Sequence, residues 1–235
     1  MNVTRRLAEL SARHDLPESA VPAIARLLEL IAEDPRAPTT LRDPRFAIDA
    51  HVADALSALD VLSLRTAGSL ADLGSGAGVP GLVLAAALPS AGVALVEANK
   101  RKCAFLDHAV AEMGLVNVTV VAQRAEGWPE GIGRHDAVTA RALAPLPVLV
   151  EYAAPLLALG GTLVAWKGRR DATEEDDGVA AAGATGLVLS EVRRVQPWDG
   201  AEQLHLHVYS KVNLTPNKYP RRPGMASKRP LRAST

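Results

Sequence analysis

The sequence predicts an α/β protein with a seven-stranded, mostly parallel sheet, an antiparallel last strand and an amino-terminal helical extension. Three observations lead to this prediction. Leucine and isoleucine recur at helical spacing through residues 3–33. Short apolar segments alternate with helical patterns after Gly68, which is typical of βαβ units. Four glycines follow the first of these segments within residues 74–81, where parallel sheets bind ligands.

The helical extension is expected to occupy residues 1–64. Two helices lie within residues 3–33, a loop with three prolines spans 34–44, and a third helix covers about 45–62. Strands are expected at 69–73, 93–97, 118–122, 136–140, 161–166, 187–195 and 203–210. Helices are expected between them at about 80–88, 100–113, 146–158 and 171–183, the last being polar and weakly helical.

The last two strands are joined by residues 196–202, which contain Pro197 and Gly200 and leave no room for a helix. A hairpin is the expected connection, so one strand runs antiparallel to the others. Residues 65–211 are thus expected to form the sheet domain, and residues 212–235 a basic carboxyl-terminal tail.

Composition favours a cytoplasmic protein. The chain of 235 residues has a single cysteine, Cys103, which excludes an internal disulfide and suits a reducing compartment. Residues 1–12 are charged and amphipathic, unlike a signal peptide. No uncharged run approaches the roughly 18 residues that a membrane span needs. We expect a monomer with no membrane segment and no metal site.

Charge is distributed unevenly along the chain. Residues 211–235 contain seven lysines or arginines and no acid, whereas residues 1–210 carry 19 basic and 26 acidic side chains, a net charge of −7. A basic tail on an acidic body is typical of a protein that contacts a polyanion, although a solvated terminus has the same composition. Tyr219 and the nearby prolines, set among the charges, suit stacking as well as phosphate contact.

The glycine segment predicts a cofactor site but does not alone identify the cofactor. Residues 76–81 match G-x-G-x-x-G, a weak signal by itself. Glu97, at the end of the next strand, suits the ribose hydroxyls of either NAD or S-adenosylmethionine. Asp72 favours S-adenosylmethionine, because a carboxylate repels a pyrophosphate but attracts a sulfonium and an ammonium. The cofactor candidates in this loop are Asp72, Gly74, Gly76, Gly78 and Val79.

A third contact region follows the third strand, where Arg124, Ala125 and Glu126 could face an adenine. Alone, Glu126 has the character of an ordinary solvated loop acid. Together with Asp72 and Glu97, however, it places acids at the ends of three successive strands.

The fourth strand lacks the residues that handle a proton. Residues 139–145 contain no Asn-Pro-Pro-Tyr or Asp-Pro-Pro-Tyr motif, and Cys103 lies far from this loop in the sequence. These absences favour a methyl acceptor that needs no general base, for which alignment supplies much of the acceleration. Arg141 is the residue most expected to face the reaction as a positioning group; the alternative is a structural ion pair.

Basic residues are expected to surround this site. Lys100 and Arg101 begin a helix, where cations oppose the helix dipole, and Lys167 and Arg169 follow the fifth strand. With the tail they form a predicted RNA-binding rim, of which a solvated charged face is the alternative. The tail members are Lys211, Tyr219, Arg221, Arg222 and Lys228.

Several motifs together resemble one bacterial family over nearly the whole chain. They are residues 72–81, Lys100-Arg101-Lys102 with Phe105-Leu106, Arg124-Ala125-Glu126, residues 139–142, Trp166-Lys167-Gly168 and residues 219–224. The family is the small-subunit ribosomal RNA guanine-N7 methyltransferase, RsmG, formerly called glucose-inhibited division protein B (GidB). The resemblance implies a class I (Rossmann-like) methyltransferase fold and transfer from S-adenosylmethionine to guanine N7 in the 530 loop of 16S rRNA, within the small ribosomal subunit.

Carried over by position, the resemblance implies cofactor contacts at Gly74, Val79, Glu97, Ala98, Asn99, Ala125, Glu126 and Arg141. The amino-terminal part departs from the family pattern at residues 37–39 and 51–55. There, His51 and Asp54 are expected to pair on one helix face rather than to catalyse. Three alternatives remain: a methyltransferase for another RNA or a small molecule, an NAD-dependent oxidoreductase, and a non-catalytic RNA-binding module.

Overall fold

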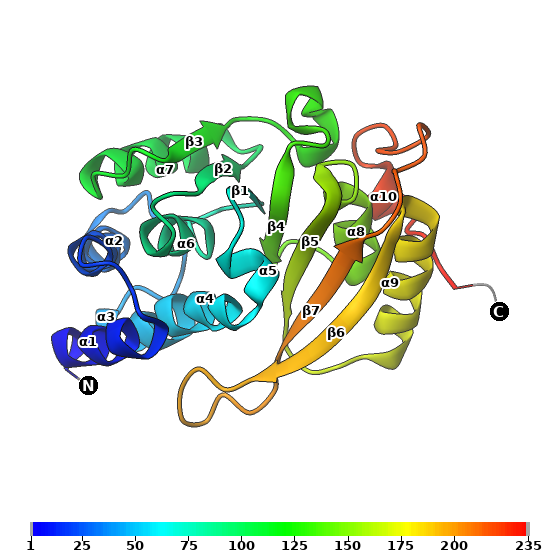
Figure 1. Cartoon of the computed structure of the whole chain (residues 1–235). Coiled ribbons are helices and arrows are strands. Elements are labelled where there is room, and N and C mark those ends of the chain that lie inside the picture. Colours follow the sequence, from blue (N-terminus) through cyan, green and yellow to red (C-terminus); the bar gives the residue numbers. More distant parts are fainter. Residues whose placement is uncertain (1, 234–235) are drawn as a thin grey trace.

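The computed structural model describes residues 2–233 and contains one seven-stranded sheet (Figure 1). The strand order is β3-β2-β1-β4-β5-β7-β6, and β7 runs in the opposite direction to the other six strands. The strands are β1 (Ser69–Leu73), β2 (Gly92–Val96), β3 (Val118–Val121), β4 (His135–Arg141), β5 (Leu157–Lys167), β6 (Leu187–Val195) and β7 (Leu204–Lys211). The predicted fold class is confirmed, including the hairpin that ends the sheet.

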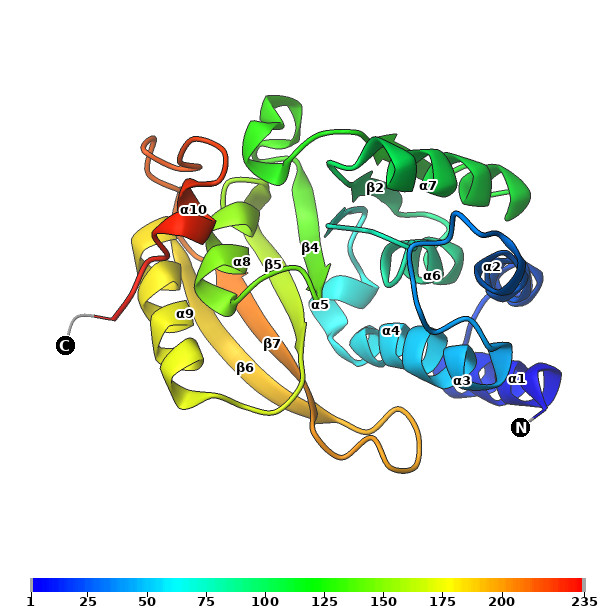
Figure 2. The same ribbon diagram turned by 180° about the vertical axis from the view of Figure 1, so that it is seen from behind.

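Helices cover both faces of this sheet (Figures 1 and 2). One face packs against α6 (Gly81–Ala87), α7 (Lys100–Glu112) and the amino-terminal helices α1 (Val3–His14) and α2 (Ala20–Glu33). The other face packs against α8 (Leu146–Ala153) and α9 (Ala172–Thr185). Alternate residues of β1 divide between the two cores, Leu70 facing the first and Ala71 the second, as the period of a strand requires.

The third helix of the extension differs from the continuous helix expected over 45–62. The chain there forms α3 (Pro44–Ala47), a π-helical turn (Ile48–Ala53), α4 (Asp54–Leu56) and a 3₁₀ turn (Ser57–Asp60), followed by α5 (Leu62–Arg65). Insertions of π-helix occur most often at functional sites. In this π turn the carbonyl of Ala50 accepts a hydrogen bond from Arg141, a contact from a distant strand that helical periodicity does not encode.

Two further boundaries differ from expectation. The helix expected over 146–158 ends at Ala153, because Pro155 follows and β5 already begins at Leu157. The expected polar segment 171–183 forms the regular helix α9, whose small residues Gly178, Ala181 and Ala182 are buried.

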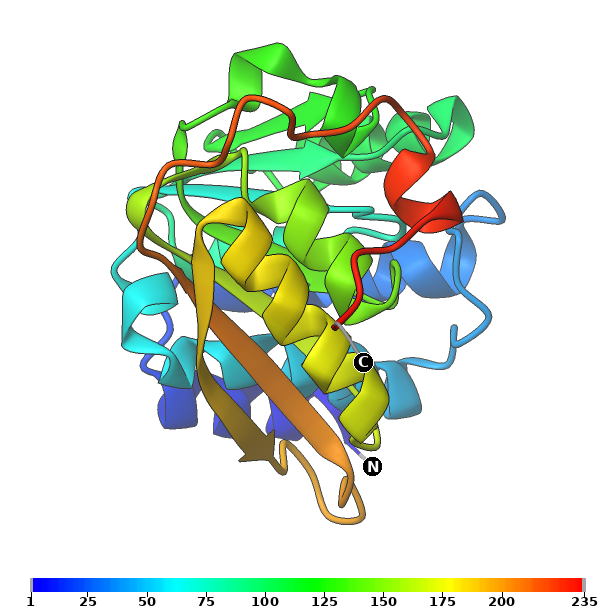
Figure 3. The same cartoon turned by 90° about the vertical axis from the view of Figure 1, so that its right-hand side faces the viewer.

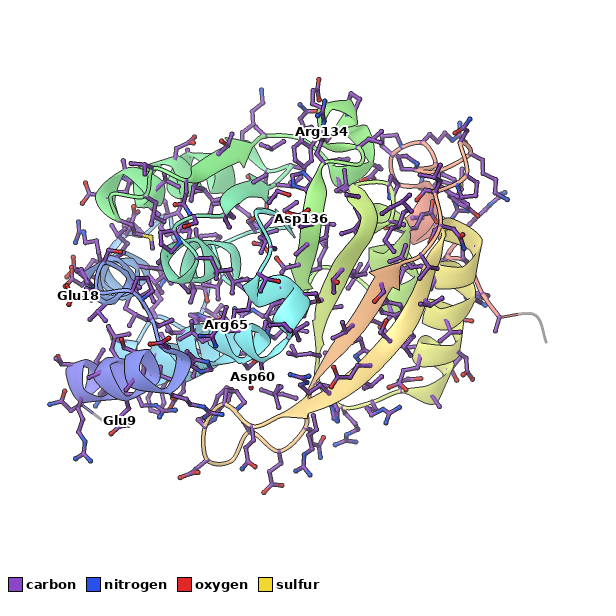
Figure 4. The ribbon with its side chains drawn as sticks, in the orientation of Figure 1. Glu9, Glu18, Asp60, Arg65, Arg134 and Asp136 are labelled. Atoms are coloured by element: carbon purple, nitrogen blue, oxygen red, sulfur yellow. The ribbon has the colours of Figure 1, made fainter. Side chains whose placement is uncertain are left out.

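The start of β1 is fixed at the amino-terminal edge of the sheet. Oδ2 of Asp136 accepts hydrogen bonds from the backbone nitrogens of Gly68 and Ser69 and from the Ser69 hydroxyl. Figure 4 labels this side chain near the first residues of β4. These bonds hold β1 against β4 from its first residue, so the glycines that follow β1 leave the sheet at a defined place.

The basic tail packs against the sheet domain. After β7 the chain contacts the carboxyl-terminal end of α9 and then forms the short helix α10 (Met225–Lys228), shown in red in Figure 3, which packs against α8. Ala226 of this helix is buried and belongs to the same apolar core as residues of α8 and α9. Residues 234–235 of the predicted tail, and Met1 of the predicted extension, lie outside the described residues.

Candidate active site

A cavity of about 380 Å³, called the main cavity because several of the predicted cofactor contacts line it, opens at the carboxyl ends of the first four strands. Gly74 follows β1, Glu97 and Ala98 follow β2, residues 123–126 follow β3, and residues 142–144 follow β4. This is the crevice where open α/β sheets bind ligands, and its volume is within the usual range for small-molecule sites. The structure thus brings together the strand ends that the sequence predicts to form one site.

The glycine loop requires glycine at several positions, and two of them, Gly74 and Gly81, bear directly on the site. Gly74 has φ +67°, and a Cβ there would lie 2.6 Å from a methyl group of Leu143. Gly81, at the start of α6, would place a Cβ 2.4 Å from Leu95 and 2.7 Å from Oδ2 of Asp72. Of the predicted loop contacts, Gly74 lines the cavity, whereas Gly76, Gly78 and Val79 shape the loop without lining it.

Asp72 lies beneath the loop. Its side chain is fully buried, accepts hydrogen bonds from Thr139 Oγ1 (2.9 Å) and Gly81 N (3.3 Å), and does not line the cavity. Burial raises the pKa of this carboxyl to about 6. The expectation that its carboxylate faces a bound cofactor is therefore corrected: Asp72 joins β1, β4 and the start of α6.

Glu97 lines the cavity and is held at both carboxylate oxygens. Oε1 accepts a hydrogen bond from Asn99 N (2.8 Å), and Oε2 accepts one from Gly76 N (3.2 Å). Asn99 does not line the cavity; its side chain caps α7 by accepting from Arg101 N and Lys102 N. Each oxygen of Glu97 keeps a lone pair that can accept a hydroxyl donor, and the carboxylate is fixed in orientation before any ligand arrives.

The far end of the cavity contains residues from three separate parts of the chain. Ala125 and Glu126, in a 3₁₀ turn after β3, lie there as expected. Tyr152 of α8 and Ser227 of α10 also line the cavity, with 3.0 Å between their hydroxyl oxygens. No local sequence pattern predicts that Tyr152 and Ser227 line the cavity, because the contact between them forms only when the tail packs against α8.

Arg141 lies outside the main cavity and binds the amino-terminal helices. Its Nη1 donates to Asp54 Oδ2 and to the carbonyl of Ala50, both at 2.8 Å, and its Nη2 lies 3.3 Å from His51 Nδ1. His51 and Asp54 therefore do not pair with each other as expected; each contacts Arg141. Burial and the Arg141 charge lower the pKa of His51, so a neutral ring accepts this bond.

A second cavity, also of about 380 Å³, lies next to the first. Arg141, Asp54, Trp166 and Lys167 line it, and Ala142 lines both cavities. Ala142 has φ +54°, a left-handed conformation that is costly for a residue with a Cβ and that occurs most often at functional sites. Two adjoining spaces at one sheet edge can hold two reactants in contact.

The predicted RNA-binding residues fall into two groups. Lys100, Arg101, Arg222 and Lys228 form no ion pair with any of residues 2–233. Arg169 donates to Gln203, and Lys167 lies 2.6 Å from Oε1 of Glu174. These residues keep positions at the surface or in the second cavity.

The remaining three do not fit direct RNA contact. Lys211 is buried, and its amine donates to the carbonyls of Ala154 and Thr185 and to Thr215. Tyr219 is buried, with Lys218 over its ring, so its face is not free for stacking. Arg221 is bound by Glu151. Their predicted role is corrected: these side chains fasten the tail to the sheet domain.

No group of three or more histidine, cysteine, aspartate or glutamate side chains within residues 2–233 is arranged to hold a metal ion. In the same described part of the chain, no helix has the length and apolar character to cross a membrane.

Comparison with known proteins gives one consistent result. The family model described as rRNA small subunit methyltransferase G (GidB) matches residues 32–199. The "ribosomal RNA small subunit methyltransferase G" of Rubrobacter xylanophilus is 42% identical over 197 residues, 81% of this chain and 76% of its own. That of Thermotoga neapolitana is 40% identical over 215 residues, 91% of this chain and 93% of its own.

Solved structures show the same fold at low identity. A 16S rRNA (adenine(1408)-N(1))-methyltransferase from Catenulisporales acidiphilia has a TM-score of 0.52 at 18% identity, covering 66% of this chain and 91% of its own. A SAM-dependent O-methyltransferase from Thermotoga maritima has a TM-score of 0.51 at 18% identity, covering 68% and 66%. The fold is therefore that of the S-adenosylmethionine-dependent methyltransferases.

Proposed function

The chain belongs to the rRNA small subunit methyltransferase G family, and we propose on that premise that it methylates guanine N7 in the 530 loop of 16S rRNA with S-adenosylmethionine. The observation that carries the proposal is the pair of cavities that meet at Ala142. One cavity suits a nucleoside cofactor, and the other lies where the target base must approach it. The NAD-dependent alternative has no support in this family.

The main cavity fits S-adenosylmethionine in its donor set. The fixed carboxylate of Glu97 has lone pairs left for two vicinal hydroxyls, as a ribose presents. Gly74 leaves open the space that a Cβ would fill beside Leu143. Oε2 of Glu126 has no hydrogen bond with residues 2–233, and it can accept a hydrogen bond from the exocyclic amine of an adenine.

The remaining predicted contacts keep indirect roles in this assignment. Gly76 holds Glu97 through its backbone nitrogen, and Asn99 does the same from the other side. Ala98 and Ala125 contribute wall surface. Asp72 supports the loop from below, and we propose that its contribution to cofactor binding is through Gly81 and the loop shape.

The second cavity is proposed as the seat of the guanine. S-adenosylmethionine supplies a methyl group on a sulfonium, and guanine N7 offers a lone pair, so no proton has to leave before attack. The protein therefore has to align guanine N7 with the methyl group and to exclude water. Trp166 supplies an apolar surface, and Arg141, itself oriented by Asp54, is the positioning residue in the wall of the second cavity, next to Ala142.

The RNA-contacting surface is proposed to surround these cavities. Lys102 and Arg124 line the main cavity, and neither makes an ion pair with a described residue. Lys100 and Arg101 lie on the same first turn of α7. With Arg222 and Lys228 of the tail, these cations supply phosphate contacts. Lys167 and Arg169 are proposed to contact RNA at the second cavity. We place the protein, as a monomer, in the cytoplasm.

The test is methylation in vitro. Small-subunit RNA, or small subunits, from a strain that lacks the enzyme are incubated with the protein and S-adenosylmethionine, and the modified base is mapped. The expected product is N7-methylguanine at one position of the 530 loop. A methylated base elsewhere, a different modified atom, or unmodified RNA together with methylation of a small molecule would overturn the proposal.

A further inference from the structure

The carboxyl-terminal segment Tyr219–Lys228 is held against the sheet domain by a buried ion pair. Arg221 donates to both carboxylate oxygens of Glu151, at 2.7 and 2.5 Å, and Glu151 is only 1% exposed. A carboxylate so deeply buried depends on its partner, because an unpaired buried charge is strongly unfavourable. Tyr219 and Ala226, which precede and follow Arg221 in the sequence, are also buried. The segment therefore has a defined docked position.

The inner side of the docked segment forms part of the main cavity. Ser227 lines it and lies 3.0 Å from the hydroxyl of Tyr152, which also lines it. The backbone nitrogen of Gly224 donates to Oε1 of Glu126 at 3.0 Å. Glu126 thus touches the segment with one oxygen and keeps the other available to the cavity, so that a single carboxylate links the segment to whatever the cavity holds.

The outer side of the same segment carries free cations. Arg222 and Lys228 are exposed and make no ion pair with residues 2–233. Arg229 directly follows, also exposed, and its carbonyl accepts a hydrogen bond from Arg221. Two positive charges of the segment, and a third directly after it, therefore lie on the solvent side, while the other side of the segment closes the cavity. A polyanion bound there would hold the segment in its docked position.

We propose that Tyr219–Lys228 is a wall shared by two ligands: Gly224 and Ser227 position the cofactor from inside, and Arg222 and Lys228 bind RNA phosphates from outside. This inference rests on the proposed function. Each ligand favours the docked segment, so each strengthens the binding of the other by the same factor, as thermodynamic linkage requires. A protein whose segment is docked only part of the time binds cofactor more weakly in proportion to that fraction.

The experiment compares two neighbouring arginines in the full-length protein. Affinity for S-adenosylhomocysteine is measured by calorimetry for the wild type, Arg221→Met and Arg222→Met, each with and without a saturating 530-loop RNA hairpin. Arg221→Met is expected to weaken cofactor binding about tenfold through loss of docking, whereas Arg222→Met, which removes the same charge from an exposed site, leaves it unchanged without RNA. The hairpin is expected to tighten cofactor binding most in Arg221→Met, whose segment is docked only part of the time and keeps Arg222 and Lys228, less in the wild type, and least in Arg222→Met.

A milder variant covers the case in which Arg221→Met does not fold. Ser227→Ala removes a hydroxyl from the cavity without disturbing the ion pair, and it is expected to weaken cofactor binding several-fold at unchanged thermal stability. Trypsin cleavage after Lys228 is a second readout, and S-adenosylhomocysteine alone is expected to slow it.

The outcomes separate this inference from the proposed function. If the wild type neither binds S-adenosylhomocysteine nor methylates the RNA, the proposed function fails. If the wild type does both, but Ser227→Ala and Arg221→Met bind S-adenosylhomocysteine as tightly as the wild type and RNA does not change these affinities, the shared wall is wrong and the proposed function stands.

Discussion

Arg141 and Asp54, which are 87 residues apart in the sequence, form an ion pair with 2.8 Å between Nη1 and Oδ2. This contact joins the last residue of β4 to the start of α4, and it lies in the wall of the second cavity. Burial raises the pKa of Asp54, and Arg141 opposes that rise. The amino-terminal helices are therefore attached to the reaction end of the sheet by a charge that is costly to leave unpaired.

Replacing Arg141 is expected to affect stability and not activity alone. Arg141→Met leaves the Asp54 carboxylate buried without its partner, which costs about 3 kcal/mol, near the lower limit for buried pairs, because 19% of the arginine side chain is exposed. Guanidinium unfolding measures this loss, with Arg169→Met at an exposed site as the control. Equal unfolding midpoints for Arg141→Met and the wild type would show that the pair contributes nothing.

The sheet could be predicted from the sequence because alternating apolar segments encode it locally. The π turn at Ile48–Ala53 could not, since its hydrogen-bond partner Arg141 comes from a strand about 90 residues later. For the same reason the sequence identified His51 and Asp54 as a pair but not the residue that both of them bind. Arg141 was expected to face the reaction or form a structural ion pair, and the second alternative describes its contacts.

Asp72 should make stability depend on pH in the acidic range. Its pKa of about 6 in the folded protein is above the value of about 4 in the unfolded chain. The folded state thus binds the proton more tightly, and folding stability falls as pH rises from about 4 to 6, then stays level. Asp72→Asn keeps an acceptor oxygen for Gly81 N, can donate its amide to Thr139 Oγ1, and removes the titration. Its stability relative to wild type should therefore improve by about 3 kcal/mol over this interval.

The measurement is chemical unfolding of both proteins at pH 4, 5, 6 and 7. Curves of stability against pH that stay parallel for the wild type and Asp72→Asn would contradict the assignment. A difference that grew only above pH 7 would point to another group.

The tail was the least predictable part of the molecule. Its charge count is a sequence property, but which cations face solvent depends on burial that only the folded chain defines. Lys211, Arg221 and Arg222 look alike in the sequence, yet the first donates to buried carbonyls, the second binds Glu151, and the third is exposed. Deleting the tail would therefore remove core contacts together with charges, and single substitutions are the sharper test.

The salt dependence of RNA binding should distinguish these lysines and arginines. Arg222→Met removes one phosphate contact, so the slope of log K against log salt should become shallower by about 0.7 to 0.9. Lys211→Met should leave the slope unchanged and lower stability instead, because its amine has partners inside the protein. Filter binding at about 50–300 mM salt, on the order of physiological ionic strength, gives the slope for each variant. A shallower slope for Lys211→Met would mean that the Lys211 amine contacts RNA.

Glu97 offers the most direct test of the cofactor site. The carboxylate is fixed by Asn99 N and Gly76 N, and its remaining lone pairs face the cavity as acceptors. Glu97→Gln keeps the size of the side chain but replaces one carboxylate oxygen by an amide nitrogen. That nitrogen cannot accept a hydrogen bond from Gly76 N or from a ribose hydroxyl. A hydrogen bond to a charged group contributes about 1.5–3 kcal/mol, so affinity for S-adenosylhomocysteine should fall about 10- to 100-fold.

The matched control is Glu130→Gln, because Glu130 is an exposed acid outside the cavity. Calorimetry measures the affinity of both variants. Equal affinities in the two would remove Glu97 from the site and leave Glu126 as the principal acidic contact.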